Sequence, residues 1–188
     1  RSLRRDCNGC FGDLSAEALR ATMPFTADFW ISPSGSDSNP GTYESPFATL
    51  NKAFIVIGSS AGAGADLIVG MKNGIHTATV STQCPSGTSG HPFTVRAESY
   101  LGATMRPSAN VTILSLTNAA DDYQKFVDIV FDGVNQTGTK FGIWHNTGDH
   151  IWIEGCEFLN MSGSAVLIQA HNATVRNCLI HDTGLTQL

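Results

Sequence analysis

The sequence is poor in charge, and positive charge is the scarcest. Asp, Glu, Lys and Arg make up 14% of the 188 residues, against about a quarter in an average domain. Acidic residues outnumber basic ones by 16 to 11, which gives a net charge of −5. This balance argues against nucleic acid or an anionic membrane surface as a partner, because four of the basic residues lie in the first twenty: Arg1, Arg4, Arg5 and Arg20.

Long apolar runs are also lacking, and none approaches the roughly 20 residues of a membrane-spanning helix. The chain starts at Arg1 without a secretory apolar segment, so we expect a removed signal peptide or a piece of a longer chain. Four N-x-S/T sequons indicate a secreted, extracellular glycoprotein: Asn110, Asn135, Asn160 and Asn172. Asn160 has a second interpretation, as a turn residue in a hydrogen-bonded asparagine ladder.

The five cysteines are an odd set. Cys7 and Cys10 form a C-x-x-C motif, which is open to interpretation as a disulfide or as a redox motif. Without a second pair nearby, the motif does not indicate a zinc site.

Two segments early in the chain are predicted to be helices. Residues 14–23 contain good helix formers and stop at Pro24, and residues 47–57 follow Pro46 and stop at Gly58, with Ser45 as the expected N-cap. After Gly58 the pattern changes to short β-branched runs separated by Gly, Asn, Asp and Ser. These runs are too many and too short for alternating strands and helices.

An internal repeat organises the second half of the chain. At a period of 22, residues 128–134 align with 150–156 and with 172–178. Apolar and polar positions alternate within each copy, as expected of a chain that winds into a parallel β-helix with rungs about 4.8 Å apart. The alternative, three similar antiparallel strands of a sandwich, requires the agreement to arise by chance. The expected inward ladders are Ile129/Ile151/Ala173, Phe131/Ile153/Val175 and Val134/Cys156/Cys178.

The segment "FWISPSGSDSNPGTYESPFATLNKAF" (29–54) resembles the entry segment of secreted right-handed parallel β-helix proteins. This superfamily includes polysaccharide lyases that cleave pectate, alginate and chondroitin. Later segments resemble the family's coils in the same order: "AGADLIVGMKNGIHT" (63–77), "GHPFTVRAE" (90–98) and "NCLIHDTG" (177–184).

The predicted fold is therefore all-β, a right-handed parallel β-helix of about five coils with an N-terminal capping helix. We expect an extension over 1–28 that carries a short helix, and a β-helix domain over 29–188 that is open to continuation beyond 188. The helix at 47–57 is expected to cover the first coil with Phe54, Ile55 and Ile57, because an exposed sheet edge has unpaired backbone groups.

The resemblance implies that a lyase of this kind needs a Lys or Arg base, basic residues that hold an acidic sugar, and often calcium. After residue 50 there are seven basic residues, and no two are adjacent. No catalytic residue can therefore be assigned by motif match. The predicted row Asp132/Glu154/Arg176 has two interpretations: a sugar or calcium site, or an exposed stack of ion pairs worth less than about 1 kcal/mol.

Trp152 is expected to point outward between Val130 and Thr174. It is a candidate for contact with a sugar or another subunit, or for packing under a loop. The histidines sit at different coil positions, which favours structural or surface roles over metal binding: His145, His150, His171 and His181. No metal site is assigned.

Cys156 and Cys178 are expected to stack inward on adjacent coils. In-register parallel strands hold their Cβ atoms farther apart than a disulfide needs, so we predict free thiols at these two positions.

Two function classes follow, with no cofactor other than weakly indicated calcium. The first is a structural, adhesive or fibre-forming module of an extracellular surface glycoprotein. It would assemble through an open β-helix end or the N-terminal extension, with copies of itself or other matrix proteins as partners. The alternative is the N-terminal part of a polysaccharide lyase or other carbohydrate-active enzyme acting on acidic polysaccharide. A carbohydrate-binding β-helix without catalysis shares the same surface.

Overall fold

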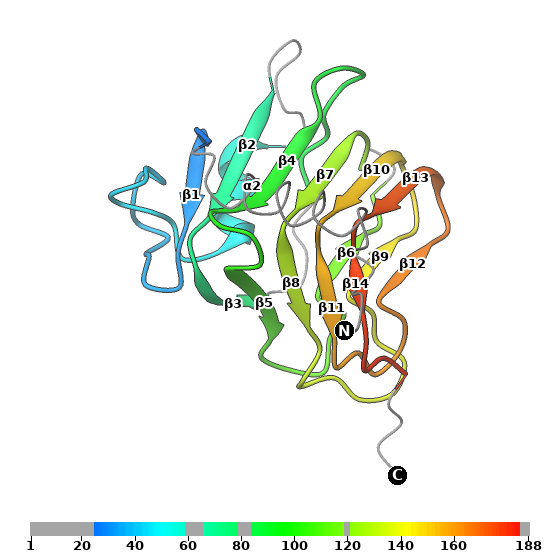
Figure 1. Cartoon of the computed structure of the whole chain (residues 1–188). Coiled ribbons are helices and arrows are strands. Elements are labelled where there is room, and N and C mark those ends of the chain that lie inside the picture. Colours follow the sequence, from blue (N-terminus) through cyan, green and yellow to red (C-terminus); the bar gives the residue numbers. More distant parts are fainter. Residues whose placement is uncertain (1–24, 59–65, 79–83, 119–120, 185–188) are drawn as a thin grey trace, which may run out of the picture.

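The computed structural model of the chain describes residues 25–58, 66–78, 84–118 and 121–184 (Figure 1). Cys7, Cys10 and the helix predicted over 14–23 lie outside these residues. The described chain winds through three parallel sheets, as the sequence predicted. From β2 the chain passes through the first sheet five times and so completes four turns, followed by the start of a fifth.

Each sheet collects one strand from successive coils. The first sheet contains β1 (Phe29–Ile31), β2 (Leu67–Met71), β4 (Phe93–Ala97), β7 (Gln124–Val127), β10 (Asp149–Glu154) and β13 (His171–Arg176). The second contains β3 (Gly74–Ala78), β5 (Ala103–Pro107), β8 (Ile129–Asp132), β11 (Glu157–Leu159) and β14 (Leu179–Ile180). The third contains β6 (Leu114–Leu116), β9 (Ile143–His145) and β12 (Val166–Ile168).

The predicted repeat is right for one pair of coils and wrong for the other. Ile151 pairs with Ala173 and Ile153 with Val175, as predicted. Residues 128–134 do not lie next to β10, because β8 belongs to the second sheet and pairs with β5 and β11. The neighbour of β10 is β7, in which Gln124 is the partner of Ile151. The coils therefore differ in length because the loops between their strands differ.

Inward side chains form continuous ladders through the stack. In the first sheet, Val69, Val95, Phe126 and Ile153 follow one another in register and are fully buried. In the second, the rings of Phe131 and Phe158 stack at 4.8 Å with an interplanar angle of 6°. Each fully buried side chain of this kind stabilises the fold by about 1.5–3 kcal/mol.

One short helix, α2 (Leu50–Ile57), covers the first coils, as predicted. Its Phe54 is buried and meets Phe93 edge-on at 5.6 Å. Ile57 packs partly against the core. The prediction was wrong for Ile55, whose side chain is 57% exposed on the outer side of the helix.

The N-cap of α2 is Thr49, so the prediction of Ser45 was wrong. Thr49 Oγ1 accepts a hydrogen bond from the Lys52 backbone N–H at 3.0 Å. Asp37 in turn accepts the backbone N–H groups of Ala48 and Thr49, both at 3.0 Å, and the Thr49 hydroxyl at 2.9 Å. The helix starts later than predicted because this carboxylate, from the preceding loop, fixes its first turn.

The turn-rich stretch after β1 folds back along the free edge of β1, where the Trp30 N–H donates to the Gly41 carbonyl oxygen at 2.7 Å and the Phe47 N–H donates to the Trp30 carbonyl oxygen at 2.9 Å. Trp30 lies over Gly70 of β2, where an added Cβ would come within 2.6 Å of the indole ring. The indole also contacts Phe25 at 5.4 Å and Tyr43 at 4.9 Å. Glycine at position 70 therefore lets an aromatic group cover the start of the stack.

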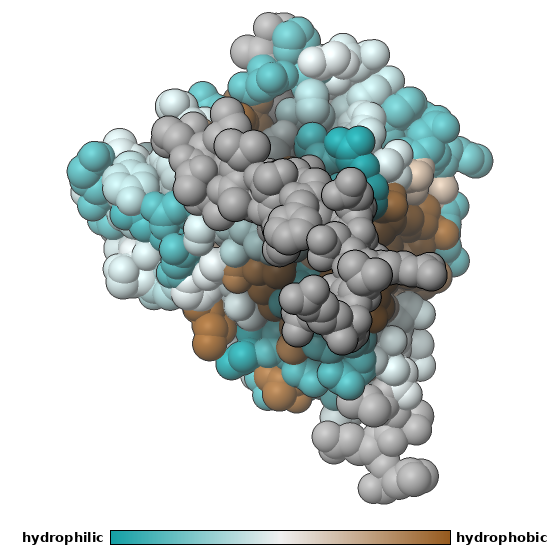
Figure 2. All heavy atoms as spheres, viewed as in Figure 1, coloured by the Kyte–Doolittle hydropathy of each residue, from teal (hydrophilic) through white to brown (hydrophobic). Residues whose placement is uncertain are grey.

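The last described coil leaves its inward side chains uncovered. Val175 and Ile180 continue the core ladders but are 43% and 49% exposed, and neighbouring Leu179 is 56% exposed. Figure 2 shows hydrophobic surface on the right, the side on which Figure 1 places β12 and β13. Within the described residues, no helix is both long enough and apolar enough to span a membrane.

Candidate functional site

The outer face of the first sheet brings polar and aromatic side chains together at β7, β10 and β13. Phe126 and Ile153 point inward, so their strand neighbours point outward. Lys125, Trp152 and Thr174 lie in one row across the three strands. Trp152 is half-buried on this outer face, next to Lys125 and not next to Val130 as the sequence predicted.

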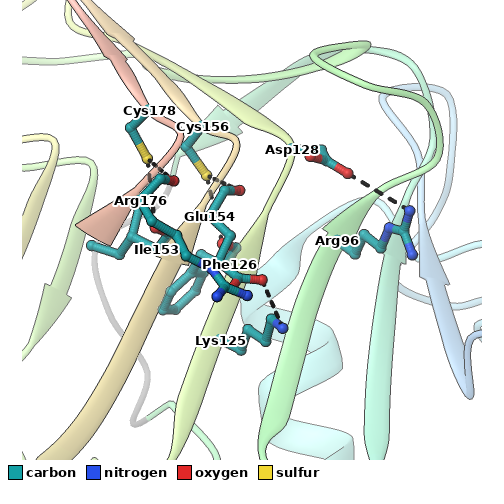
Figure 3. Close-up of polar contacts among 9 residues, drawn as sticks. All are labelled: Arg96, Lys125, Phe126, Asp128, Ile153, Glu154, Cys156, Arg176 and Cys178. Carbon is teal, nitrogen blue, oxygen red and sulfur yellow. Dashed lines mark hydrogen bonds and ion pairs between the residues drawn. The ribbon is translucent and has the colours of Figure 1, made fainter. Parts of the chain in front are cut away.

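Glu154 joins two cations on this face (Figure 3). Its carboxylate lies 2.7 Å from Lys125 Nζ and also contacts the guanidinium of Arg176 from the next coil. Burial raises the pKa of Glu154, but hydrogen bonding and charge from Lys125, and then from Arg176, outweigh burial and hold the pKa below its ordinary value. The group therefore carries two positive charges and one negative charge, and the Arg176 side chain is 58% exposed.

An aromatic cluster borders the charged group. The rings of Tyr123 and His150 stack at 4.5 Å, and Trp152 lies 6.3 Å from the first and 5.9 Å from the second. Tyr123 and His150 have left-handed backbone, with φ of 52° and 57°. They occupy equivalent positions at the entry to β7 and β10, which directs both rings to the same side of Trp152.

A second ion pair lies on the earlier coils of the same sheet. Arg96 is 3.7 Å from Asp128 and lies over the ring of Phe25 at 4.7 Å. The Asp128 side chain is buried. This pair is neutral overall and partly covered, so the exposed positive charge of the face is concentrated at Lys125 and Arg176.

Asp132 does not belong to this face, and the predicted row Asp132/Glu154/Arg176 is wrong at its first member. Asp132 ends β8 in the second sheet, where Arg106 donates to its Oδ2 at 2.6 Å and 3.0 Å. Its Oδ1 accepts from Asn160 at 2.9 Å. The two carboxylates that were expected to share calcium are therefore apart; Asp132 is paired with one cation and Glu154 with two.

Across the described ranges, no group of three or more His, Cys, Asp or Glu side chains is arranged to hold a metal ion. His181 lies between Glu157 at 3.0 Å and Asp182 at 2.8 Å, and hydrogen bonds to these two carboxylates raise its pKa. His145 is fully buried, and this burial lowers its pKa. Calcium binding stays a prediction without a placed ligand set.

Cys156 and Cys178 are free thiols on adjacent coils, as predicted. Burial raises the pKa of Cys156, whereas a hydrogen bond from Cys156 lowers the pKa of the half-buried Cys178. Cys84 is also free, and burial, followed by the charge of Asp121, raises its pKa.

Asp121 belongs to a buried polar cluster at the entry to β7. The residue is 1% exposed, its Oδ2 accepts from the Asn118 backbone N–H at 2.7 Å, and its Oδ1 has no hydrogen-bond partner. Burial raises its pKa to about 6. The ring of His145 lies 3.4 Å from its backbone carbonyl oxygen, and the buried Gln124 Oε1 is also unpaired. The cluster is inside the fold and separate from the outer face.

Sequence analysis missed Tyr123 and Lys125 as members of the candidate site. The signal was present in the segment 122–128 (DYQKFVD), which aligns with 149–155 (DHIWIEG) once the spacing between copies is allowed to lengthen. A fixed period of 22 hid this alignment because the loop between these two coils is longer.

The comparisons with known proteins concern the fold. No family model matches the chain, and no curated protein matches its sequence. A solved structure described as a rhamnogalacturonan lyase is similar, with a TM-score of 0.51 and 18% sequence identity. The match covers 74% of this chain and 43% of that one, so the chain spans less than half of the lyase. At this identity the likeness shows a shared parallel β-helix fold, as the sequence resemblance led us to expect.

Proposed function

We propose that the chain is a carbohydrate-binding β-helix domain, and that the outer face of β7, β10 and β13 binds an acidic polysaccharide. One observation carries the proposal: an aromatic cluster and two cations meet on one accessible face of a regular sheet. The similarity of the fold to that of a rhamnogalacturonan lyase is consistent with this function.

The aromatic cluster suits the apolar face of a sugar ring. Trp152 is half-buried, so its ring is held in place yet remains accessible. Contacts with Tyr123 and His150 fix its orientation. A preorganised aromatic side chain loses little conformational entropy when it binds.

The neighbouring cations suit a sugar carboxylate. Arg176 is the more exposed of the two and offers a planar pair of N–H donors. Glu154 already takes part of its charge, so a uronate must compete with an internal carboxylate. We therefore expect weak binding to one sugar that strengthens along a chain with several carboxylates.

Titration calorimetry with polygalacturonate, alginate and neutral dextran tests the proposal. We expect the two polyuronates to bind, the affinity to fall as salt rises, and dextran to bind more weakly. Trp152→Ala should weaken binding about fivefold, since an aromatic contact contributes about 1 kcal/mol. Arg176→Gln should weaken polyuronate binding about tenfold, because a hydrogen bond to a charged group contributes about 1.5 kcal/mol or more.

Lys140→Gln is the matched control, because it removes one cation from the loop between β8 and β9. If the wild-type protein binds none of the three polymers, the proposal fails. It fails equally if Lys140→Gln weakens binding as much as Arg176→Gln does.

Lyase activity is the enzymatic alternative. A general base must be unprotonated to remove a proton, yet both cations of the site are ion-paired with Glu154. The described geometry therefore supports binding better than catalysis. Ultraviolet absorbance of unsaturated uronate products, measured with the same polymers, separates the two functions.

A structural or adhesive module is a second candidate, favoured by the uncovered ladder at β13 and β14. Val175 and Ile180 line an open apolar hollow with Ala165, Val166 and Ile168. A second copy of the chain stacked on this surface would cover them, and because α2 covers the first coils, two open ends would meet in a dimer. Size-exclusion chromatography with light scattering should then show dimers that Val175→Asp dissociates. Discrete monomers of the wild-type protein would exclude this function.

A further inference from the structure

The asparagines of the four sequons differ in whether the side-chain nitrogen, Nδ2, donates a hydrogen bond within the protein. Asn135 Nδ2 donates to the Pro107 carbonyl oxygen at 2.7 Å. Asn160 Nδ2 donates to Asp132 and Asn172 Nδ2 to Asp149, both at 2.9 Å. These acceptors are a carbonyl and two carboxylates, so the atom facing them must be the nitrogen. An N-linked sugar replaces one of the two hydrogens on this nitrogen, so at these three sites the sugar would have to fit beside an acceptor that is already bonded to the same atom.

In Asn110 the side-chain oxygen, and not the nitrogen, makes the contact with the protein. Its Oδ1 accepts the backbone N–H of Thr137 at 2.8 Å, which only the oxygen can do. Among the described residues, nothing accepts a hydrogen bond from its Nδ2, and the residue is exposed. The oxygen contact directs the nitrogen away from the Thr137 loop, and attachment of a sugar would leave that contact in place.

Two of the other sequon asparagines have a separate structural reason to be asparagine. Asn160 and Asn172 have left-handed backbone, with φ of 55° and 52°, a conformation in which asparagine is enriched. Asn160 aligns with Asp182, which has a φ of 50° at the equivalent turn. Asn110 is not among the residues with positive φ.

The backbone at Asn110 also presents the side chain to solvent. The Val111 N–H donates to the Ala109 carbonyl at 2.9 Å, which closes a three-residue turn with Asn110 at its tip. This turn lies between β5 and β6, at the corner between the second and third sheets. A glycan there does not border the outer face of the first sheet.

From these observations we infer that Asn110 is the N-glycan acceptor of this chain, and that Asn135, Asn160 and Asn172 are structural asparagines. The inference is independent of the proposed carbohydrate binding, because it concerns a sugar attached to the chain and a different corner of the coil.

Peptide mass mapping tests the inference after secretion of the chain from a eukaryotic host and enzymatic deglycosylation in ¹⁸O-water. We expect the isotope label at Asn110 alone. Asn110→Gln should abolish the glycan, and Thr112→Val should abolish it while leaving Asn110 in place. The control Asn172→Gln should keep the glycan.

The role of the structural asparagines is tested separately, by the thermal stability of their variants. Asn160→Ala should lower the thermal midpoint by about 5 °C, because it removes a hydrogen bond to a carboxylate and strains a left-handed position. Asn110→Gln should lower the midpoint by less, about 2 °C, because it removes only the exposed hydrogen bond with the Thr137 N–H. A glycan on Asn135, Asn160 or Asn172, or a secreted chain without any glycan, would overturn the assignment.

Discussion

Replacing Asp121 with asparagine should stabilise the protein at neutral pH and leave it unchanged or weaker in acid. The Asp121 carboxyl is 1% exposed, and burial raises its pKa from 3.8 to about 6. A carboxyl with a raised pKa keeps its proton in the folded state at pH values where the unfolded chain has lost it. Its contribution to the free energy of unfolding is therefore greatest below about pH 4, falls between pH 4 and 6, and stays low above pH 6.

The size of the effect follows from the shift in pKa. Two pKa units correspond to about 3 kcal/mol. As the pH rises from 4 to 7, the free energy of unfolding of Asp121→Asn should therefore increase by about 2–3 kcal/mol relative to that of the wild type. The asparagine Oδ1 can still accept the Asn118 N–H, and its Nδ2 is a donor where the aspartate has an unpaired oxygen. The side chain of Gln124 hydrogen-bonds this carboxyl, and a turn of its amide group would bring its unpaired Oε1 to the new Nδ2 donor.

Urea denaturation at pH 4, 5, 6 and 7, followed by circular dichroism, measures the effect. The other titrating groups around Asp121, which are Cys84, Asp122 and His145, are present in both proteins, so the difference between the two curves isolates Asp121. The exposed carboxylate Glu44 provides the control. Glu44→Gln removes the same charge from an exposed position and so controls for the change in net charge. A difference between Asp121→Asn and wild type that stays constant from pH 4 to 7 would refute the reasoning.

Three further changes have expected outcomes. Phe158→Ala should reduce the free energy of unfolding by about 3–5 kcal/mol in urea titrations, because the ring is fully buried and stacked on Phe131; a loss below about 1 kcal/mol would contradict the ladder. Asp37→Ala should cost about 1–2 kcal/mol in thermal unfolding, since its carboxylate holds Thr49 and the first turn of α2. Cys178 should react with iodoacetamide at pH 7 before the buried thiols of the described region do, because it is half-buried and its pKa is lowered; peptide mapping gives the order, and earlier labelling of a buried thiol would contradict it.

The sequence could predict the fold because alternation within a strand survives in every coil. It could not predict all of the register, because the strands of every sheet alternate in the same way. Residues 128–134 carry apolar side chains at Ile129 and Phe131 and so match β10 as well as they match their true neighbour β11. Only the loop lengths distinguish the two alignments. Along the first sheet, paired residues are separated by the predicted 22 residues only between β10 and β13. The prediction was right where the loops are short.

The candidate site was predicted in part for the same reason. Trp152, Glu154 and Arg176 lie on the two coils that were aligned correctly, and they share one face. Lys125 and Tyr123 lie one coil earlier, before the longer loop, and the predicted alignment wrongly assigned Asp132 to that coil position. The N-cap of α2 was missed because Asp37, a carboxylate from the loop well before Thr49, fixes the helix start. A contact of this kind cannot be read from local sequence.

The unequal coils also affect how the chain folds. From β2 onward, every strand pairs only with strands of the coils directly before and after its own. Each new coil therefore needs only the coil before it, whose exposed strand edges provide the hydrogen-bonding partners. The entropic cost of closing a loop rises only slowly with its length, so a longer loop in one coil reduces the stability of the fold only slightly. Such a chain could add coils in order as it leaves the ribosome. The slowest step would be the first coil, where β1 pairs with β2 across the whole segment that contains α2.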